Sequence, residues 1–224
     1  MTPPSPLSVE WLGRVAYGPA LALQQAAVRR RRDGEGPDRL LLLEHPPVVT
    51  LGRGAQEENL RLGRAELCER GVEVHEVARG GDVTFHAPGQ LVGYLIMDLR
   101  ERGRPDLHAF LRSLEGALIE AIADLGVAGR RVEGRTGVFV DSGEDASGPD
   151  RKIASIGVGA RRWITYHGFA LNVTIDLEGF EMIVPCGLHD VEMTSLAREL
   201  GCGPLGLDAR VRKAVERSFS RAFA

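Results

Sequence analysis

The chain has 224 residues, of which 43% are hydrophobic and 26% charged, and its formal net charge is -3. This composition is typical of a globular protein, and the slight negative charge argues against an extended basic surface for nucleic acid. No run approaches the ~20 apolar residues that a membrane-spanning helix requires, and the first residues lack the basic and apolar regions of a secretory signal. We expect a single domain over residues 1–224.

Apolar periodicity and turn residues predict the elements of the first half of the chain. A helix is expected from Gly18-Pro19 to Arg32, because proline suits a first helical turn and the arginines at 29–32 suit a helix C-terminus. The other expected elements are strands at 40–43, 48–51, 72–77 and 91–97 and a short helix at 64–70 closed by Gly71.

In the second half, apolar residues at three- and four-residue steps predict a long helix from Pro105 to Leu125, which Gly126 ends. Strands and helices intermix without a regular βαβ period, so we predict an α+β fold with a mixed or antiparallel sheet flanked by helices. The remaining expected elements are strands at 138–140, 153–158 and 164–175 and helices at 193–200 and 208–223.

The segment from Arg79 to Gln90 is the first specific feature, and it reads Arg-Gly-Gly-Asp-Val-Thr-Phe-His-Ala-Pro-Gly-Gln. Its glycines at 80 and 81 let the backbone approach a ligand closely or take positive φ. The β-prone residues that follow, and the Pro-Gly turn, predict a strand-loop-strand element with Arg79 and His86 at its ends and exposed backbone N–H groups. An ordinary hairpin would explain the turn glycines alone. Neither a Walker loop nor a dinucleotide-binding fingerprint occurs here.

The use of lysine is unusual, because only Lys152 and Lys213 among the 28 basic residues are lysines. Arginine provides positive charge at the other positions. A lysine therefore indicates a position where the side chain must lose its proton, unless it is retained by chance on the surface. Lys213 lies in a polar helical tail and fits the latter reading. Lys152 begins the stretch Lys-Ile-Ala-Ser-Ile-Gly, at the mouth of an expected buried strand.

The cysteines at 68, 186 and 202 are odd in number and widely spaced, which argues against a disulfide framework or a metal clip and favours a reducing cytoplasm. Cys186 lies between Pro185 and Gly187, on a turn from which its side chain can project. A lysine ammonium nearby would favour its thiolate, which could accept an acyl group that the lysine then helps to pass to an amine. The alternative is that Cys186 is a small buried hydrophobic residue.

Four blocks of sequence together resemble the octanoyltransferases of lipoate biosynthesis. They are the segment 79–90, Lys-Ile-Ala-Ser-Ile-Gly at 152–157 with His-Gly-Phe-Ala-Leu-Asn at 167–172, Pro-Cys-Gly-Leu at 185–188, and Glu-His-Pro-Pro-Val-Val-Thr-Leu-Gly at 44–52. The resemblance covers about residues 9–220. Ala87 stands where glycine is common in the family, and the loop at 141–151, which would lie at the rim of the site, is longer than usual.

The resemblance implies an α+β fold like that of biotin- and lipoate-protein ligase catalytic domains. It implies that Cys186 carries an octanoyl thioester and that Lys152 favours the thiolate of Cys186. The roles of His86 and His167 stay open. Each could orient the acyl carbonyl, form a hydrogen bond to the Cys-Lys pair, or only form hydrogen bonds to backbone groups near the pocket. The implied acyl-site residues are Arg79, Gly80, Gly81, Asp82, Val83, Thr84, Phe85, His86, Ser155, Ile156, Gly157, Gly168, Phe169 and Ala170.

The implied donor is octanoyl-acyl carrier protein, and the implied acceptors are lipoyl domains of 2-oxoacid dehydrogenase complexes and the glycine cleavage H protein. This transfer would be the first step of protein lipoylation. Because the donor thioester is already activated, no cofactor or metal is expected, and we expect a cytoplasmic monomer without nucleic-acid or membrane partners. One alternative is an ATP-dependent lipoate- or biotin-protein ligase, which needs no cysteine. Another is a carrier-domain-binding module without catalysis.

Overall fold

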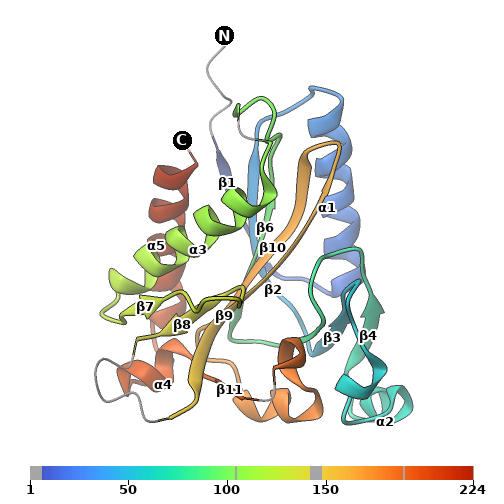
Figure 1. Ribbon diagram of the computed structural model, residues 1–224, viewed down its shortest axis with the longest axis vertical. Helices are drawn as coiled ribbons and strands as arrows, with labels where there is room; N and C mark the ends of the chain where they lie inside the picture. The colour runs from blue at the N-terminus through green and yellow to red at the C-terminus, as the bar shows by residue number, and fades with distance from the viewer. Residues whose placement is uncertain (1–6, 104, 142–147, 189, 224) are drawn as a thin grey trace.

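The computed structural model describes residues 7–103, 105–141, 148–188 and 190–223 (Figure 1). Within these residues, the main sheet consists of β1 (Ser8–Arg14), β2 (Arg39–Glu44), β6 (Gln90–Ile96), β7 (Gly129–Arg130), β8 (Val138–Val140), β9 (Asp150–Arg161), β10 (Ile164–Asn172) and β11 (Val191–Met193). The strand order is β1-β2-β6-β10-β9-β8-β7, and β11 pairs with β9. The β1–β2 and β9–β11 pairs are parallel and the others antiparallel, which confirms the predicted mixed sheet.

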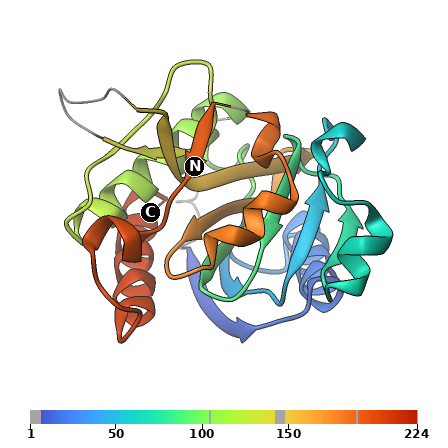
Figure 2. The ribbon, with the colours of Figure 1, turned by 90° about the horizontal axis from the view of Figure 1, so that it is seen from below.

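A smaller sheet lies beside the main sheet (Figure 2), and the sequence analysis does not predict it as a separate unit. It consists of β3 (Val48–Leu51), β4 (Glu73–Glu76) and β5 (Val83–His86), in the order β4-β3-β5. Because β5 pairs with β3 and not with β6, the segment 79–90 is no hairpin, and its two strands belong to different sheets. Of the backbone N–H groups expected to be exposed in this segment, those of residues 83–86 belong to a buried strand.

Helices cover both faces of the main sheet. The helix α1 (Tyr17–Arg32) packs on one face, whereas α3 (Leu107–Ala123) and α5 (Leu207–Ala222) pack together on the other (Figure 1). The short α2 (Arg64–Glu69) belongs with the smaller sheet, and α4 (Leu196–Leu200) precedes α5. In the part of the chain that the structure describes, no helix combines the length and the apolar character needed to cross a bilayer.

The helix α3 shows how the sequence pattern becomes structure. Asp106 caps its N-terminus by accepting hydrogen bonds from the backbone N–H groups of His108 and Ala109. Burial of each large apolar side chain on its inner face contributes roughly 1.5–3 kcal/mol. The inner face, which packs in the core shared by the sheet and α5, comprises Phe110, Leu114, Leu118 and Ile122.

Some expectations from the sequence are wrong at particular residues. The helix predicted at 193–200 begins only at Leu196, as α4, where the Ser195 side chain caps it, and Met193 is instead the last residue of β11. The strand predicted at 164–175 ends at Asn172, because the next three backbone N–H groups turn to the carbonyl of Gly89. The strands β1 and β7 were not expected, since β1 is a largely exposed edge and β7 has two residues. The assignment of one domain to residues 1–224 stays a prediction.

A buried ion network closes the C-terminal end of α1. Arg31 is 4% exposed, donates from Nε to the Asp38 carboxylate at 2.7 Å, and also pairs with Glu101. Asp38 is fully buried and accepts further hydrogen bonds from Arg102 at 2.7 Å and from the backbone N–H of Asp98 at 3.2 Å. The hydrogen bond to Glu101, opposed by burial and supported by Asp38, raises the pKa of Arg31. One member of the basic run at the helix end therefore ties α1 to the loop after β6.

We expect Asp38→Ala to lower the free energy of unfolding by about 3–5 kcal/mol, because it leaves buried Arg31 without one of its two carboxylate partners. Denaturant titration measures this loss. Asp33→Ala is the matched control, since Asp33 also pairs with an arginine, Arg32, but the pair is exposed and its removal should change the midpoint little. Equal losses from the two variants would contradict the importance assigned to burial.

Candidate active site

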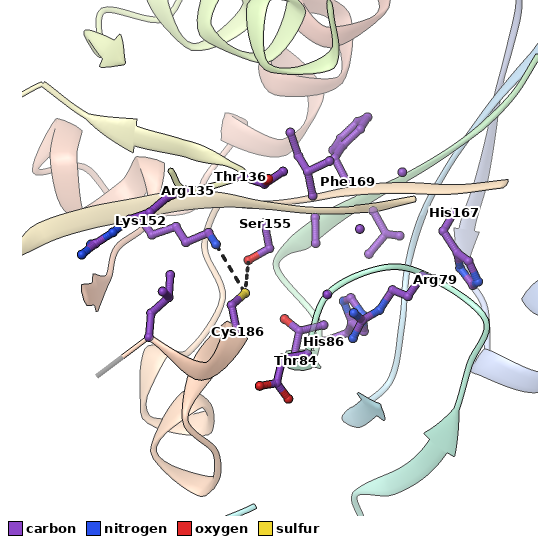
Figure 3. A pocket seen from close by; sticks show the side chains of 18 of the residues that line it. Arg79, Thr84, His86, Arg135, Thr136, Lys152, Ser155, His167, Phe169 and Cys186 are labelled. Atoms are coloured by element: carbon purple, nitrogen blue, oxygen red, sulfur yellow. Dashed lines mark hydrogen bonds between the residues drawn. The ribbon is translucent and has the colours of Figure 1, made fainter. Parts of the chain in front are cut away.

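A cavity of about 230 Å³ lies where the main sheet meets the smaller sheet, and Figure 3 shows it from close by. Its walls come from α1, the segment 79–86, β6, the loop 134–136, β9, β10 and the turn that carries Cys186. The residues that line it are Tyr17, Arg79, Gly81, Asp82, Thr84, His86, Val92, Tyr94, Gly134, Arg135, Thr136, Lys152, Ser155, Ile156, Gly157, His167, Gly168, Phe169, Ala170, Cys186 and Leu188.

Cys186 lies on a short 3-10 turn, η4 (Pro185–Gly187). Its backbone is left-handed, with φ 57° and ψ 19°, and Gly187 follows with φ 67°. This conformation costs a residue other than glycine roughly 1–2 kcal/mol, so the surroundings must hold the turn in place. The thiol projects into the cavity, as the Pro-Cys-Gly sequence predicts (Figure 3).

Polar contacts from the side of the smaller sheet hold this turn. The backbone N–H of Val184 donates to the Asn59 carbonyl at 2.8 Å, and the Asn59 side-chain amide donates to the carboxylate of Asp82. The same carboxylate accepts hydrogen bonds from two backbone N–H groups. A Cβ on Gly187 would come within 2.7 Å of Asp82 Oδ2, so glycine is needed for the turn to close against that carboxylate.

Lys152 comes from β9 and is only 2% exposed, yet it reaches the cavity. Its Nζ donates a hydrogen bond to Cys186 Sγ at 3.3 Å, and Ser155 Oγ lies 3.9 Å from the same sulfur (Figure 3). The Nζ also lies 5.6 Å from the ring centroid of Phe139, within the range of a cation–π interaction. The ammonium is therefore in position to stabilise negative charge on the sulfur.

The buried lysine needs space that glycine at position 137 provides. A Cβ on Gly137 would approach Lys152 Cε to 2.8 Å and the Ala154 carbonyl oxygen to 2.6 Å, and the residue has φ +132°. Glu115 of α3, which is fully buried, fixes this backbone by accepting from the Gly137 N–H at 3.1 Å. Its other carboxylate oxygen accepts from two arginines. A helix on the far side of the sheet thus holds the wall beside the lysine.

Arg79 fills the space between the two sheets and is 8% exposed. Its guanidinium donates to the carbonyl and hydroxyl oxygens of Thr50 at 2.8 and 2.9 Å and to the Gly80 carbonyl at 3.0 Å. Burial lowers the pKa of Arg79. A Cβ on Gly157 would lie 3.0 Å from Arg79 Cδ, so this glycine of β9 admits the protein's own arginine. Gly81 takes positive φ, +82°, as the sequence predicts.

His86 is held by a chain of side-chain amides. Its Nδ1 lies 2.7 Å from Gln90 Oε1, and because that oxygen only accepts, His86 donates from Nδ1. Gln90 donates in turn to Asn172 Oδ1 at 2.9 Å, and Asn172 donates to the Thr194 carbonyl at 2.8 Å. Burial first, and then the neighbouring His45, lower the pKa of His86 to about 3. The imidazole is therefore neutral near pH 7.

Two tyrosines form the polar wall farther along α1 and β6. His45 Nδ1 lies 2.7 Å from the Val15 carbonyl and must donate to it, so His45 Nε2, 2.9 Å away, accepts from the Tyr94 hydroxyl. Burial raises the pKa of Tyr17 to about 12 and raises that of Tyr94 well above its usual value. Both hydroxyls consequently stay protonated at physiological pH.

His167 is a positive-φ residue in the middle of β10, with φ 58°, and its ring is 4% exposed at the cavity. Its backbone N–H donates to Gln24 Oε1 of α1 at 2.6 Å. Burial first, and then Arg79, lower the pKa of His167 to about 3. In Figure 3, His167 lies on the opposite side of the view from the Lys152–Cys186 contact, and Arg79 lies between them.

Most of the residues expected from the sequence come together at this cavity. Gly80, Val83 and Phe85 do not line it. Val83 and Phe85 point from the other side of β5 into the core of the smaller sheet, and the Gly80 backbone N–H pairs with the Val158 carbonyl on β9. The expected residues that do line it are Arg79, Gly81, Asp82, Thr84, His86, Lys152, Ser155, Ile156, Gly157, His167, Gly168, Phe169, Ala170 and Cys186.

Several lining residues were missed from the sequence. The sequence could have indicated Tyr94, which is a lone hydroxyl-bearing residue in a strongly apolar strand. It could not have indicated Tyr17 or the 134–136 loop, because tertiary packing alone brings them to the cavity. Cys68 and Cys202 are exposed free thiols away from the lining. Of the rim loop at 141–151, residues 142–147 lie outside the described residues. Among the residues described, no cluster of three or more His, Cys, Asp or Glu could hold a metal ion.

The sequence is similar to a known family model and to several known proteins. Residues 16–220 match the family model described as the lipoyl protein ligase A/B catalytic domain. An octanoyltransferase of Acidobacterium capsulatum is 49% identical over 223 residues, covering 97% of this chain and 90% of that protein. An octanoyltransferase of Geobacter metallireducens is 50% identical over 209 residues, covering 93% and 89%.

Two solved structures share the fold at low sequence identity. A lipoate-protein ligase A bound with ATP has a TM-score of 0.71 at 18% identity, covering 98% of this chain and 85% of that one. A bi-partite lipoate protein ligase from Thermoplasma acidophilum has a TM-score of 0.72 at 16% identity, covering 98% and 83%. The predicted likeness to the lipoate-protein ligase fold is confirmed.

The buried histidines predict a loss of stability in acid. The pKa of His167 is about 3 in the folded protein and about 6.5 in an unfolded chain, so the unfolded state binds the proton first as pH falls. Stability is fully present above about pH 6.5 and should fall by up to about 1.4 kcal/mol per pH unit for this histidine between about pH 6 and pH 3. His167→Asn, which tolerates positive φ, should reduce the slope of unfolding free energy against pH.

Denaturant titrations at about pH 7, 6 and 5 measure that slope. His108→Asn is the control, because His108 is exposed on α3 and its substitution should leave the slope as in the wild type. A His167→Asn slope equal to that of the wild type would contradict a buried neutral imidazole.

Proposed function

This chain belongs to the octanoyltransferases, within the family of lipoyl protein ligase A/B catalytic domains, and on that premise we propose that it transfers an octanoyl group from octanoyl-acyl carrier protein to a lysine of lipoyl domains. The proposed acceptors are the lipoyl domains of 2-oxoacid dehydrogenase complexes and the glycine cleavage H protein. The single observation that carries the mechanism is the 3.3 Å contact between Lys152 Nζ and Cys186 Sγ at the cavity.

The first half-reaction loads the cysteine. The thiolate of Cys186, facing the Lys152 ammonium, attacks the carbonyl carbon of the donor thioester. A new carbon–sulfur bond forms, the bond to the carrier thiol breaks, and the leaving thiolate takes a proton from Lys152. The products are an acyl thioester on Cys186, a free carrier thiol and a neutral lysine.

The second half-reaction transfers the acyl group to nitrogen. The amine of the acceptor lysine attacks the Cys186 thioester, and neutral Lys152 takes the proton that this nitrogen loses. Collapse of the intermediate forms the amide bond and expels the Cys186 thiolate. Lys152 is again an ammonium beside a thiolate, so the cycle closes without a cofactor, and atoms and protons balance.

The cavity supports the role of acyl site. Cys186 lines it together with the apolar residues Ile156, Phe169 and Ala170. Apolar side chains near the sulfur suit a saturated chain, and the buried surroundings exclude bulk water, which would otherwise hydrolyse the thioester. The proposed acyl-site residues are the lining residues that the sequence also identified.

We expect octanoyl-acyl carrier protein to add one octanoyl group to the wild-type protein, on Cys186, because the thioester intermediate is covalent. Intact-mass measurement followed by peptide mapping reports both the group and the residue. Cys186→Ser should form no thioester and lose nearly all transfer to a lipoyl domain. Cys68→Ser is the matched control, since Cys68 is exposed away from the cavity, and it should keep both.

Measurements on Cys186→Ser and on the wild type also separate the alternative functions. A Cys186→Ser protein that keeps most of its activity, with dependence on ATP and free acid, would instead identify a ligase. A wild type that binds the carrier protein but transfers nothing would identify a non-catalytic binding module.

Lys152 has two proposed roles, proton transfer and stabilisation of the Cys186 thiolate by its positive charge. Different substitutions separate the two. Lys152→Arg keeps the positive charge but cannot give up its proton, so transfer should fall about 10²- to 10⁴-fold while alkylation of Cys186 at neutral pH stays comparatively fast. Lys152→Met should slow both, because it also removes the charge. Acyl transfer kinetics and iodoacetamide labelling measure the two effects. Wild-type transfer by Lys152→Arg would reduce the lysine to an electrostatic neighbour.

A further inference from the structure

The hydroxyl of Thr84 is a buried polar group without a partner at the cavity. Thr84 is 6% exposed, and among the residues described its Oγ1 is one of three buried side-chain polar atoms that lack a hydrogen bond. The other two, on Gln24 and Arg151, belong to residues that do not line the cavity. A buried hydroxyl without a hydrogen-bond partner destabilises the free protein. Its presence at the cavity therefore indicates a bound group that accepts a hydrogen bond from it.

The direction of the Thr84 side chain follows from the alternation of β5. Val83 and Phe85 enter the core of the smaller sheet, which turns Thr84 and His86 toward the cavity. The strand is fixed by its antiparallel pairing with β3, in which Thr84 lies opposite Thr50. In Figure 3, Thr84 projects beside Cys186, between that residue and His86.

The sulfur already has its own partners in the free protein. Lys152 donates to Cys186 Sγ, and Ser155 Oγ lies within 3.9 Å of it, whereas the Thr84 hydroxyl makes no hydrogen bond to the thiol. An acyl group on the sulfur brings a new acceptor, its carbonyl oxygen, into this space. A threonine hydroxyl has one proton to donate, and a carbonyl oxygen can only accept.

We propose that the Thr84 hydroxyl donates a hydrogen bond to the carbonyl oxygen of the acyl group as the Cys186 thiolate attacks it. The inference rests on the proposed function and adds a residue that contacts the reacting atoms. When the carbon–sulfur bond forms, the carbonyl electron pair moves onto oxygen, and the hydrogen bond stabilises that charge without transfer of the proton. When the intermediate collapses, the carbonyl re-forms and the carrier thiolate leaves. The same contact serves the second half-reaction.

Thr84→Val tests this directly, because valine has nearly the same shape and lacks the hydroxyl. Removing an unpartnered buried hydroxyl should raise Tm by about 2–4 °C. The rate constant for loading of Cys186 by octanoyl-acyl carrier protein should fall about 10²-fold, while KM changes less than about threefold. The pH profile of Cys186 alkylation by iodoacetamide should stay as in the wild type, since the thiol contacts are untouched. Thr84→Ser should recover loading to within about tenfold.

Other outcomes would overturn the inference. Loading of Thr84→Val at the wild-type rate would show that the hydroxyl does not act on the acyl group. A shifted alkylation profile would place its effect on the thiol instead. A lower Tm, with no rescue by Thr84→Ser, would make the residue purely structural. A wild-type protein that forms no acyl adduct overturns the proposed function itself, and the wild-type measurement therefore comes first.

Discussion

The contact between Lys152 and Cys186 depends on the residues around it. The lysine is only 2% exposed, and burying an ammonium costs free energy unless neighbouring groups stabilise its charge. The sulfur and the Phe139 ring interact favourably with the positive charge of Lys152. Gly137, which has no side chain, leaves room for the lysine. On the other side, Asp82 holds the turn that presents the sulfur. The pair is thus the product of two sheets, the lysine coming from one and its partner from a loop secured by the other.

The sequence predicts the parts of this site better than their assembly. Periodicity and turn residues located most of the helices and strands, since local propensity and burial agree there. The Pro-Cys-Gly turn and one of the two lysines indicated Cys186 and Lys152 as the candidate pair. The separation of β5 and β6 into two sheets was missed, because strand pairing is a tertiary choice. Gly137 and Glu115 were missed for the same reason. They meet beside Lys152 only because α3 packs behind the sheet, which is tertiary structure.

Charge in the cavity is sorted by burial. The two lining histidines, His86 and His167, are neutral, and the two lining tyrosines keep their protons, so these four side chains contribute dipoles without ionic charge. Arg79 satisfies its donors on backbone and hydroxyl oxygens. The ionic side chains that line the cavity are those of Arg79, Arg135, Lys152 and Asp82, and Asp82 lies behind the turn.

The two-sheet origin of the reactive pair has a consequence for the life of the chain in the cell. Cys186 and Lys152 are 34 residues apart, and in an unfolded chain they are an ordinary thiol and an ordinary amine. The contact that we propose for acyl transfer forms only when the smaller sheet has docked and the left-handed turn at Cys186 has closed against Asp82. Under the proposed mechanism, a nascent or damaged molecule therefore does not consume activated acyl groups, and acyl transfer reports that folding is complete.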